Sequence, residues 1–286
     1  MIRRMVAASV LCASLVMSLF ASAPALAQGP ADSFVALPTR SGVTLPLAVT
    51  APEHPRGVVI LLAGSKGLVG ITGDGGKVVM RNGGNFLVRS RGLFVAQGLA
   101  VIVVDTPSDE PDGMSAAFRL SASHVEDLRR VVAYARERFG LKPWLVGTSM
   151  GTFSAAYAAA NLPPEELGGV ALTSTIARGA LRWALPSGYG NGVLGVDLKA
   201  IRVPALVVRH QNDLCEFSAP EAGPRILEAL AAAPHKALLT FAGGEPARSK
   251  ACDAFAPHGY LGIEGEVVAG MAAFILEGSP RVGSGR

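Results

Sequence analysis

The sequence has few of the patterns by which proteins bind nucleic acid, hold a catalytic metal or span a membrane. It contains no run of lysines and arginines interleaved with aromatic residues, which is the pattern of a nucleic-acid-binding face. No two histidines stand four positions apart and the cysteines lack zinc-type spacing, so a metal hydrolase is disfavoured. Beyond an apolar N-terminal segment, no stretch is long and apolar enough to cross a membrane. Nucleic acid is therefore not an expected partner, and no metal is expected.

The N-terminal segment has the organisation of a secretory signal peptide. Arg3 and Arg4 precede the apolar stretch Met5–Phe20, and Ala25-Leu26-Ala27 has the small-x-small form of a cleavage site. A membrane anchor is the alternative interpretation, but the apolar core is short for a span. We therefore expect residues 1–27 to be removed, and the protein to be periplasmic or secreted with no stable membrane anchor.

Removal of this segment changes the charge and the cysteine content. The segment carries two of the 26 basic residues, which leaves 24 against 22 acidic residues and only a weakly basic chain. Cys12 lies inside the apolar core of the signal, where lipid attachment is not expected, and leaves with it. The remaining pair, Cys215 and Cys252, favours a disulfide in an oxidising compartment. Two unrelated buried thiols are the alternative.

Residues 28–286 suit one large domain in which strands and helices alternate. Strands are predicted at residues 34–37, 43–49, 58–64, 99–105, 142–148, 168–175, 205–211 and 237–243, and helices at 86–98, 114–139, 150–162, 220–233 and 266–278. Such alternation predicts an α/β fold with a mainly parallel central sheet and helices on both faces. Pro46 is expected to put its strand at the sheet edge. Residues 65–85 are expected to form a glycine-rich loop, and residues 176–200 a small cap over the strand ends.

The stretch WLVGTSMGTFSAA, residues 144–156, has the features of a turn that carries a nucleophilic serine. A strand ends and a helix begins here, which is the context of a nucleophile elbow. The backbone of Ser149 would be strained in such a turn, so the residues two before and two after it must be small. Gly147 and Gly151 meet that requirement. An ordinary glycine-rich turn is the alternative, and it would require no other catalytic residue.

A base and an acid follow the serine in the order that this chemistry requires. His258 lies in the long loop between the last strand and the last helix, from which a general base would reach the serine. The other histidines lie in a proline-rich turn, on a helix, or beside strands at unsuitable positions. Asp213 follows an intervening strand, in VVRHQNDLCEF, and would orient the histidine. Glu216 is the alternative acid.

Two backbone N–H groups are needed to stabilise the oxyanion that forms in such a reaction. One is expected from Met150, directly after the serine, and the other from Ser65 in AGSKG. Cys215 and Cys252 stand close in sequence to the acid and the base respectively, so a bridge between them would fasten the acid loop to the base loop.

The motifs GTSMG, QNDLC and PHG, in this order and spacing, resemble those of the α/β-hydrolase superfamily. The chain is similar overall, over roughly residues 43–278, to exported bacterial esterases and dienelactone-hydrolase-like proteins. The resemblance implies that Ser149 attacks an acyl carbonyl, His258 takes the proton and Asp213 orients the imidazolium, with no cofactor. The substrate would be a small-molecule ester or acyl compound. Ala63 stands where the superfamily usually has histidine.

The cap segment carries the expectations about substrate binding. Trp183, Leu185 and Tyr189 would line an apolar acyl pocket, with packing into the core as the alternative. The sequence does not separate an esterase from a serine peptidase or an acyltransferase with the same triad. A catalytically silent binding protein of this fold is the remaining alternative.

Overall fold

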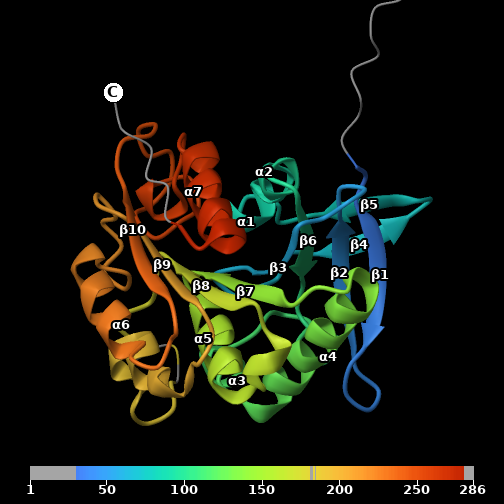
Figure 1. The fold of residues 1–286 in the computed structure, drawn as a ribbon, viewed down its shortest axis with the longest axis horizontal. Helices are drawn as coiled ribbons and strands as arrows, with labels where there is room; N and C mark the ends of the chain where they lie inside the picture. The colour runs from blue at the N-terminus through green and yellow to red at the C-terminus, as the bar shows by residue number, and fades with distance from the viewer. Residues whose placement is uncertain (1–29, 181–182, 184, 280–286) are drawn as a thin grey trace, which may run out of the picture.

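The computed structural model describes residues 30–180, 183 and 185–279, so the predicted signal peptide lies outside the described residues. Eight strands form one sheet in the order β1-β2-β6-β3-β7-β8-β9-β10. Their bounds are β1 Ser33–Pro38, β2 Thr44–Thr50, β3 Gly57–Leu62, β6 Leu99–Val104, β7 Pro143–Thr148, β8 Gly169–Thr173, β9 Ala205–His210 and β10 Lys236–Phe241. β2 runs antiparallel to β1 and β6, and all other neighbours are parallel. The predicted mainly parallel sheet is therefore present (Figure 1).

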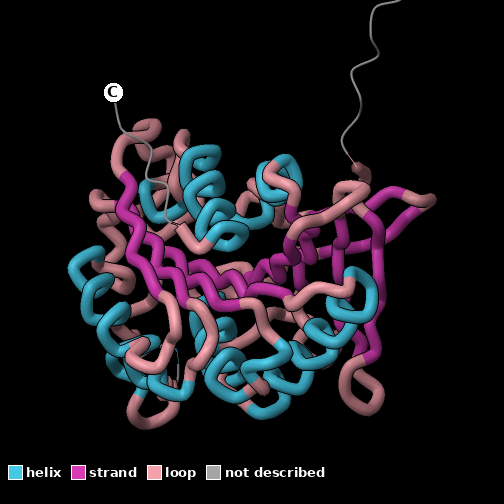
Figure 2. The backbone as a smooth tube through the Cα atoms, viewed as in Figure 1, coloured by secondary structure: helices cyan, strands magenta, loops and turns pink. Residues whose placement is uncertain are grey.

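Helices cover both faces of this sheet (Figures 1 and 2). One face carries α1 Phe86–Arg89, α2 Arg91–Ala96 and α7 Glu264–Glu277; the other carries α3 Ala116–Arg119, α4 Ala122–Phe139, α5 Gly151–Asn161 and α6 Gly223–Ala229. Short 3-10 helices among the described residues are η1 Pro164–Glu166, η3 Tyr189–Gly195, η4 Leu198–Ala200, η5 Pro220–Ala222 and η6 Pro257–Gly259. Ile60 and Leu62 pack in the cluster below α4 and α5, while Val59 and Leu61 pack in the cluster below α2 and α7. Because both faces are covered, the central strands β3 and β6 carry no polar side chain.

The expected loop at residues 65–85 contains a second, two-stranded sheet, and here the sequence prediction was wrong. β4 (Ile71–Asp74) and β5 (Lys77–Met80) pair antiparallel around Gly75 and Gly76. Both glycines have positive φ angles, 53° and 80°, as a tight two-residue hairpin turn requires. The glycine pair that suggested an irregular loop is therefore the turn of the hairpin.

The predicted helix over residues 114–139 is broken into α3 and α4. The break lies at Leu120, and the side chain of Ser121 then accepts a hydrogen bond from the N–H of His124 at 3.3 Å. A serine in this place caps the first turn of the new helix. As predicted, α4 ends at Gly140, whose φ is 68°. The break turns α3 and its last residue, Arg119, toward the strand ends.

The strand that contains Pro46 is not at the sheet edge as expected, because β2 lies between β1 and β6. The carbonyl of Pro46 accepts a hydrogen bond from the N–H of Asp105 at 3.1 Å, so this residue directs its polar groups toward β6. The β2–β6 pairing itself begins only at Leu47. The missing N–H of the proline thus falls just beyond the β2–β6 ladder, while Pro46 itself pairs with Ala36 of β1.

The segment expected to form a cap, residues 176–200, is anchored in the core by some of its residues. Ile176 and Val193 are fully buried, and the N–H of Ala177 donates to the carbonyl of Phe217 at 2.7 Å. The segment therefore forms a wall beside the loop that follows β9. Within the described ranges, no helix combines the length and apolarity needed to cross a membrane.

Candidate active site

Ser149 occupies the sharp turn between β7 and α5. Its φ angle is 52°, a left-handed conformation that costs free energy for a residue with a Cβ atom. Its N–H donates to Thr173 O at 3.0 Å, and its carbonyl accepts from the N–H of Thr152 at 2.9 Å and from the hydroxyl of Thr152 at 2.6 Å. These bonds hold the turn in the conformation that presents the serine side chain at the end of the strand.

The small residues on either side of Ser149 are required by backbone contacts. A Cβ atom at Gly147 would lie 2.4 Å from Gly151 O, and one at Gly151 would lie 2.1 Å from Leu62 O. Neither backbone oxygen can move away without displacing β3 or α5. The sequence expectation that both positions must be small therefore has its physical basis in the packing of α5 against the sheet.

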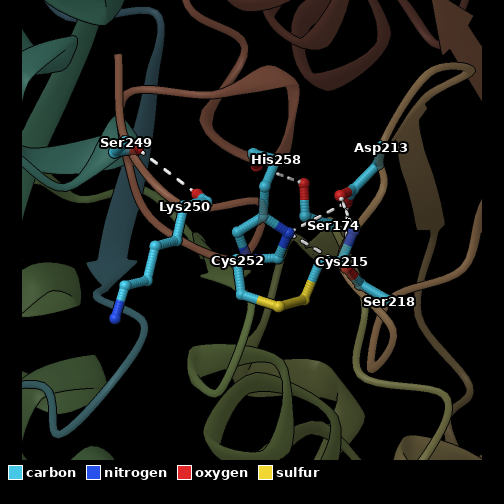
Figure 3. The surroundings of a disulfide bond; sticks show 8 residues. All are labelled: Ser174, Asp213, Cys215, Ser218, Ser249, Lys250, Cys252 and His258. Carbon is cyan, nitrogen blue, oxygen red and sulfur yellow. Dashed lines mark hydrogen bonds and ion pairs between the residues drawn. A yellow bond between two sulfur atoms is a disulfide. The ribbon is translucent and has the colours of Figure 1, made fainter. Parts of the chain in front are cut away.

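Asp213 and His258 form a buried pair beside this turn. Asp213 lies in the loop after β9, His258 lies in η6, and Oδ2 of the carboxylate is 2.9 Å from Nδ1 of the imidazole (Figure 3). Only 1% of the Asp213 side chain and 5% of the His258 side chain are exposed. The other ring nitrogen, Nε2, is buried and has no hydrogen-bond partner among the described residues. Glu216, the alternative acid, is exposed and lines a different cavity.

Two cavities meet at Ser149. The first, which we call the base-side cavity, has a volume of about 480 Å³ and is lined by Ser149, His258 and Ser65 among others. The second, the cap-side cavity, has a volume of about 510 Å³ and is lined by Ser149, Met150, Ser65 and Trp183 among others. The structure therefore brings the predicted nucleophile, base and oxyanion donors to one place, with space for a small molecule on either side of the serine.

The predicted oxyanion loop lies directly against Ser149. A Cβ atom at Gly64 would lie 2.9 Å from the Cβ atom of Ser149, so only glycine allows this approach. Ser65 follows with a φ angle of 50°. The N–H groups of Ser65 and Met150 make no hydrogen bond within the described chain, and both residues line the cap-side cavity. Both N–H groups are therefore available to an acceptor.

The predicted disulfide is present between Cys215 and Cys252, with a Cα–Cα distance of 4.6 Å (Figure 3). The N–H of Cys215 donates to Oδ1 of Asp213 at 2.9 Å, so the bridge holds the group that orients the carboxylate. Cys215 is buried, whereas Cys252 is exposed. Both cysteines line the cap-side cavity.

Sequence reasoning missed three residues that hold the Asp213–His258 pair. The hydroxyl of Ser218 donates to Asp213 Oδ2 at 2.8 Å and lies 2.9 Å from His258 Nδ1. The hydroxyl of Ser174 donates to the carbonyl of His258 at 2.7 Å. Tyr260 is fully buried, and its hydroxyl donates to Val208 O at 3.0 Å and accepts from the N–H of Ser174 at 3.1 Å.

Burial raises the pKa of Tyr260, so its phenol stays protonated and can act as the donor that this network requires. The role of Ser218 could have been inferred from the sequence, because this serine lies only five residues after Asp213 in the same loop. Tyr260 carried no such signal, because its partners lie far away in the sequence.

Of the three residues predicted to bind substrate, the structure brings only Trp183 to Ser149. Trp183 lines the cap-side cavity, and its ring centroid is 4.6 Å from that of Phe217. Leu185 and Tyr189 line neither cavity, and all three residues pack against the core. In the part of the chain that the structure describes, no group of three or more His, Cys, Asp or Glu side chains is arranged to hold a metal ion.

Comparison with known proteins assigns this architecture to a recognised fold. A family model described as alpha/beta hydrolase fold matches residues 98–194. None of the curated protein sequences compared with the chain matches it. The resemblance seen in the sequence motifs is thus supported by a region that includes the turn around Ser149.

Solved structures with the same fold include hydrolases of several kinds. A puromycin-hydrolyzing peptidase of Mycobacterium tuberculosis aligns with a TM-score of 0.60 at 17% identity, covering 93% of this chain and 43% of that one. A dienelactone hydrolase from Anabaena variabilis aligns at 0.56 and 16%, covering 89% and 100%. A serine hydrolase without a lid from Xanthomonas campestris aligns at 0.51 and 17%, covering 90% and 96%. At these identities the likeness establishes the fold.

Proposed function

We propose that this chain, which has the α/β-hydrolase fold, is a serine hydrolase that cleaves carboxylic esters of small molecules. Ser149 is the nucleophile, His258 the general base and Asp213 the acid that orients it. The observation that carries the proposal is the common cavity: a serine in a left-handed turn and a histidine paired with a buried carboxylate line the same space. Such a trio is the requirement for nucleophilic catalysis by serine.

The reaction proceeds through an acyl-enzyme. Ser149 Oγ bonds to the acyl carbon while its proton passes to Nε2 of His258, and the carbonyl electron pair becomes an oxyanion. The N–H groups of Met150 and Ser65 donate to that oxyanion. The alcohol then leaves with the proton held by His258. Water then attacks the acyl carbon while His258 takes its proton, and the carboxylic acid leaves as Ser149 Oγ regains a proton from His258. The Asp213 carboxylate stabilises the imidazolium in both half-reactions.

Hydrolysis of short p-nitrophenyl esters by the purified protein tests this proposal. We expect turnover of the acetate and butyrate esters that is lost after treatment with a serine-directed phosphonate. Peptide amides and an alcohol acceptor, assayed in parallel, distinguish a peptidase or an acyltransferase, which would use the same triad. A protein that neither turns over any of these nor reacts with the phosphonate would be a binding protein, contrary to the proposal.

We also propose that the protein is exported and acts on small molecules rather than nucleic acid. The N-terminal pattern of residues 1–27 supports export, with cleavage after Ala27 leaving one domain, residues 28–286, with its cap-like segment at about 176–200. The Cys215–Cys252 bridge adds support, because disulfides persist in oxidising compartments. The two cavities at Ser149 have the size of small-molecule sites.

Replacement of Trp183 by alanine is expected to shift substrate preference toward longer acyl chains. Trp183 bounds the cap-side cavity, and removal of its indole opens that cavity beside Ser149. The ratio of kcat/KM for octanoate to that for acetate esters should rise about tenfold, the discrimination that one or two methylene groups give in an apolar pocket. Leu185→Ala, at a position that lines neither cavity, is the control. An unchanged preference in the Trp183 variant would assign the indole to the core instead.

Reduction of the disulfide is expected to impair activity before it unfolds the sheet. The closure spans 37 positions and is worth about 3–4 kcal/mol in the chain-entropy model. Because Cys215 donates directly to Asp213, loosening the bridge should disturb the carboxylate first. On mild warming, the reduced protein should lose ester hydrolysis while its far-ultraviolet circular dichroism persists.

The double variant Cys215→Ala/Cys252→Ala controls for other effects of the reductant. It should behave like the reduced protein and should not respond to dithiothreitol. Simultaneous loss of activity and secondary structure at one temperature would show that the disulfide stabilises the whole domain and has no particular role at the site.

A further inference from the structure

Arg119, the last residue of α3, is a buried cation with no carboxylate partner among the described residues. The residue is 1% exposed, and its guanidinium donates from Nη1 to Ser154 Oγ at 2.8 Å. From Nη2 it donates to two backbone carbonyls, Ala63 O and Ser65 O, both at 3.1 Å. No described carboxylate forms an ion pair with it, and its buried Nε has no partner in the described chain. A buried charge without an ionic partner costs stability, which hydrogen bonds offset only in part.

The neighbours of Arg119 do not neutralise its charge. Burial lowers the pKa of Arg119 to about 9, so the guanidinium remains charged near neutral pH. His124, on the far side of Ser154, places Nε2 2.9 Å from the Ser154 hydroxyl. Burial, together with the charges of Arg119 and Arg40, lowers the pKa of His124 to about 3, so this imidazole is neutral. The positive charge of Arg119 is therefore stabilised only by the dipoles of two loop carbonyls and of the Ser154 hydroxyl.

Those carbonyls belong to the oxyanion loop. Ala63 O and Ser65 O lie immediately before and after the Gly64–Ser65 peptide, whose N–H belongs to Ser65. The carbonyl of that peptide, Gly64 O, accepts from the N–H of Gly67 at 2.9 Å. Gly67 itself lies against the guanidinium, since a Cβ atom there would be 2.6 Å from Nη2. Arg119 thus holds the loop on both sides of the one peptide that presents the Ser65 N–H.

We propose that Arg119 is a positioning residue for the oxyanion site. It fixes the Gly64–Ser65 peptide in the orientation that directs the Ser65 N–H toward the substrate oxygen. It also places an uncompensated positive charge behind that peptide. The negative charge that develops on the tetrahedral intermediate supplies the counter-charge that the folded protein lacks, so the stabilisation is greatest in the transition state. This inference rests on the proposed serine-hydrolase function.

Two substitutions separate the parts of this role. Arg119→Met removes the charge and all the donors at similar volume, and Arg119→Lys keeps a charge but cannot hold two carbonyls at once. Arg56→Met is the matched control, because Arg56 also donates to a backbone carbonyl, Gln97 O, but is exposed and lines neither cavity. Each variant is measured for kcat and KM with a short ester and for inhibition by an alkyl boronic acid. Ser149 Oγ bonds to boron while its proton passes to Nε2 of His258, so the boronate becomes a tetrahedral anion.

We expect kcat of Arg119→Met to fall about 100-fold, the loss typical of one oxyanion donor, with KM changed less than about threefold. Boronate affinity should fall by a similar factor, and Arg119→Lys should lie between the wild type and Arg119→Met. A purely structural role would lower the melting temperature but leave kcat and boronate affinity of the folded protein within threefold of the wild type, and that result would overturn the inference. If Arg119→Met does not fold, Arg119→Lys decides by the same criteria.

The wild-type protein separates failure of this inference from failure of the proposed function. A wild type that neither hydrolyses esters nor binds the boronic acid contradicts both. A wild type that does both, together with Arg119 variants indistinguishable from it, contradicts only the role of Arg119.

Discussion

Replacement of Ser149 by alanine is expected to lower ester turnover by about four to six orders of magnitude while the protein still folds. The substitution removes the only atom that the proposed mechanism bonds to the substrate. Within the described residues, the Ser149 hydroxyl makes no hydrogen bond that the fold needs, and alanine keeps the Cβ atom that packs against Gly64. Steady-state turnover of p-nitrophenyl acetate, with circular dichroism as the check on folding, measures this effect.

Ser41→Ala is the matched control for this prediction. Ser41 is an exposed serine in the β1–β2 turn and lines neither cavity. Its substitution should leave turnover unchanged. Turnover of the Ser149 variant within tenfold of the wild type would show that another residue is the nucleophile.

Replacement of Asp213 by asparagine is expected to lower turnover by about 10⁴-fold with little change in the fold. Oδ1 of Asp213 accepts from the N–H of Cys215, so the amide oxygen of asparagine must take that side. The NH₂ group then faces Nδ1 of His258, which must become the acceptor. The ring proton moves to Nε2, and that nitrogen can no longer take the proton of Ser149. The pH profile of kcat/KM, recorded with turnover, reports the pKa of the base that remains in the variant.

Two control variants test whether the effect is specific to Asp213. Glu216→Gln changes the nearby exposed carboxyl in the same way and should have no effect on turnover, since Glu216 lines a different cavity. Ser218→Ala removes one hydrogen bond to Asp213 but keeps the acceptor for His258, so we expect a loss of about tenfold, the value of one hydrogen bond. A loss for Glu216→Gln equal to that for Asp213→Asn would move the acid to Glu216.

The sharp turn around Ser149 could be predicted from the sequence because its requirements are local. Gly147, Ser149 and Gly151 stand within one turn, and the clashes that exclude larger residues are with backbone atoms that any protein of this architecture would place there. Asp213 and His258 were predicted to lie near this turn from a different signal, because each lies in a loop that follows a predicted strand. Parallel strands end at the same edge of a sheet, so order along the chain translated into proximity.

The residues that hold the site in place could not be predicted in either way. Arg119 reaches Ala63 across 56 positions, from the point where the helix predicted over residues 114–139 breaks at Leu120. Tyr260 joins the ends of β8 and β9 through contacts 52 and 86 positions away. Each depends on a tertiary contact with a backbone group, which leaves no residue pattern in the sequence. The β4–β5 hairpin was missed for a different reason, because its glycine turn is also the composition of a loop.

The site of covalent modification by a serine-directed phosphonate tests the central claim most directly. After reaction with the intact protein, digestion and mass spectrometry identify the modified residue. The account predicts one phosphonate per chain, attached to Ser149, with no adduct in the Ser149→Ala variant and a much slower reaction in His258→Ala. An adduct on any other residue, or none in a protein that hydrolyses esters, would contradict it.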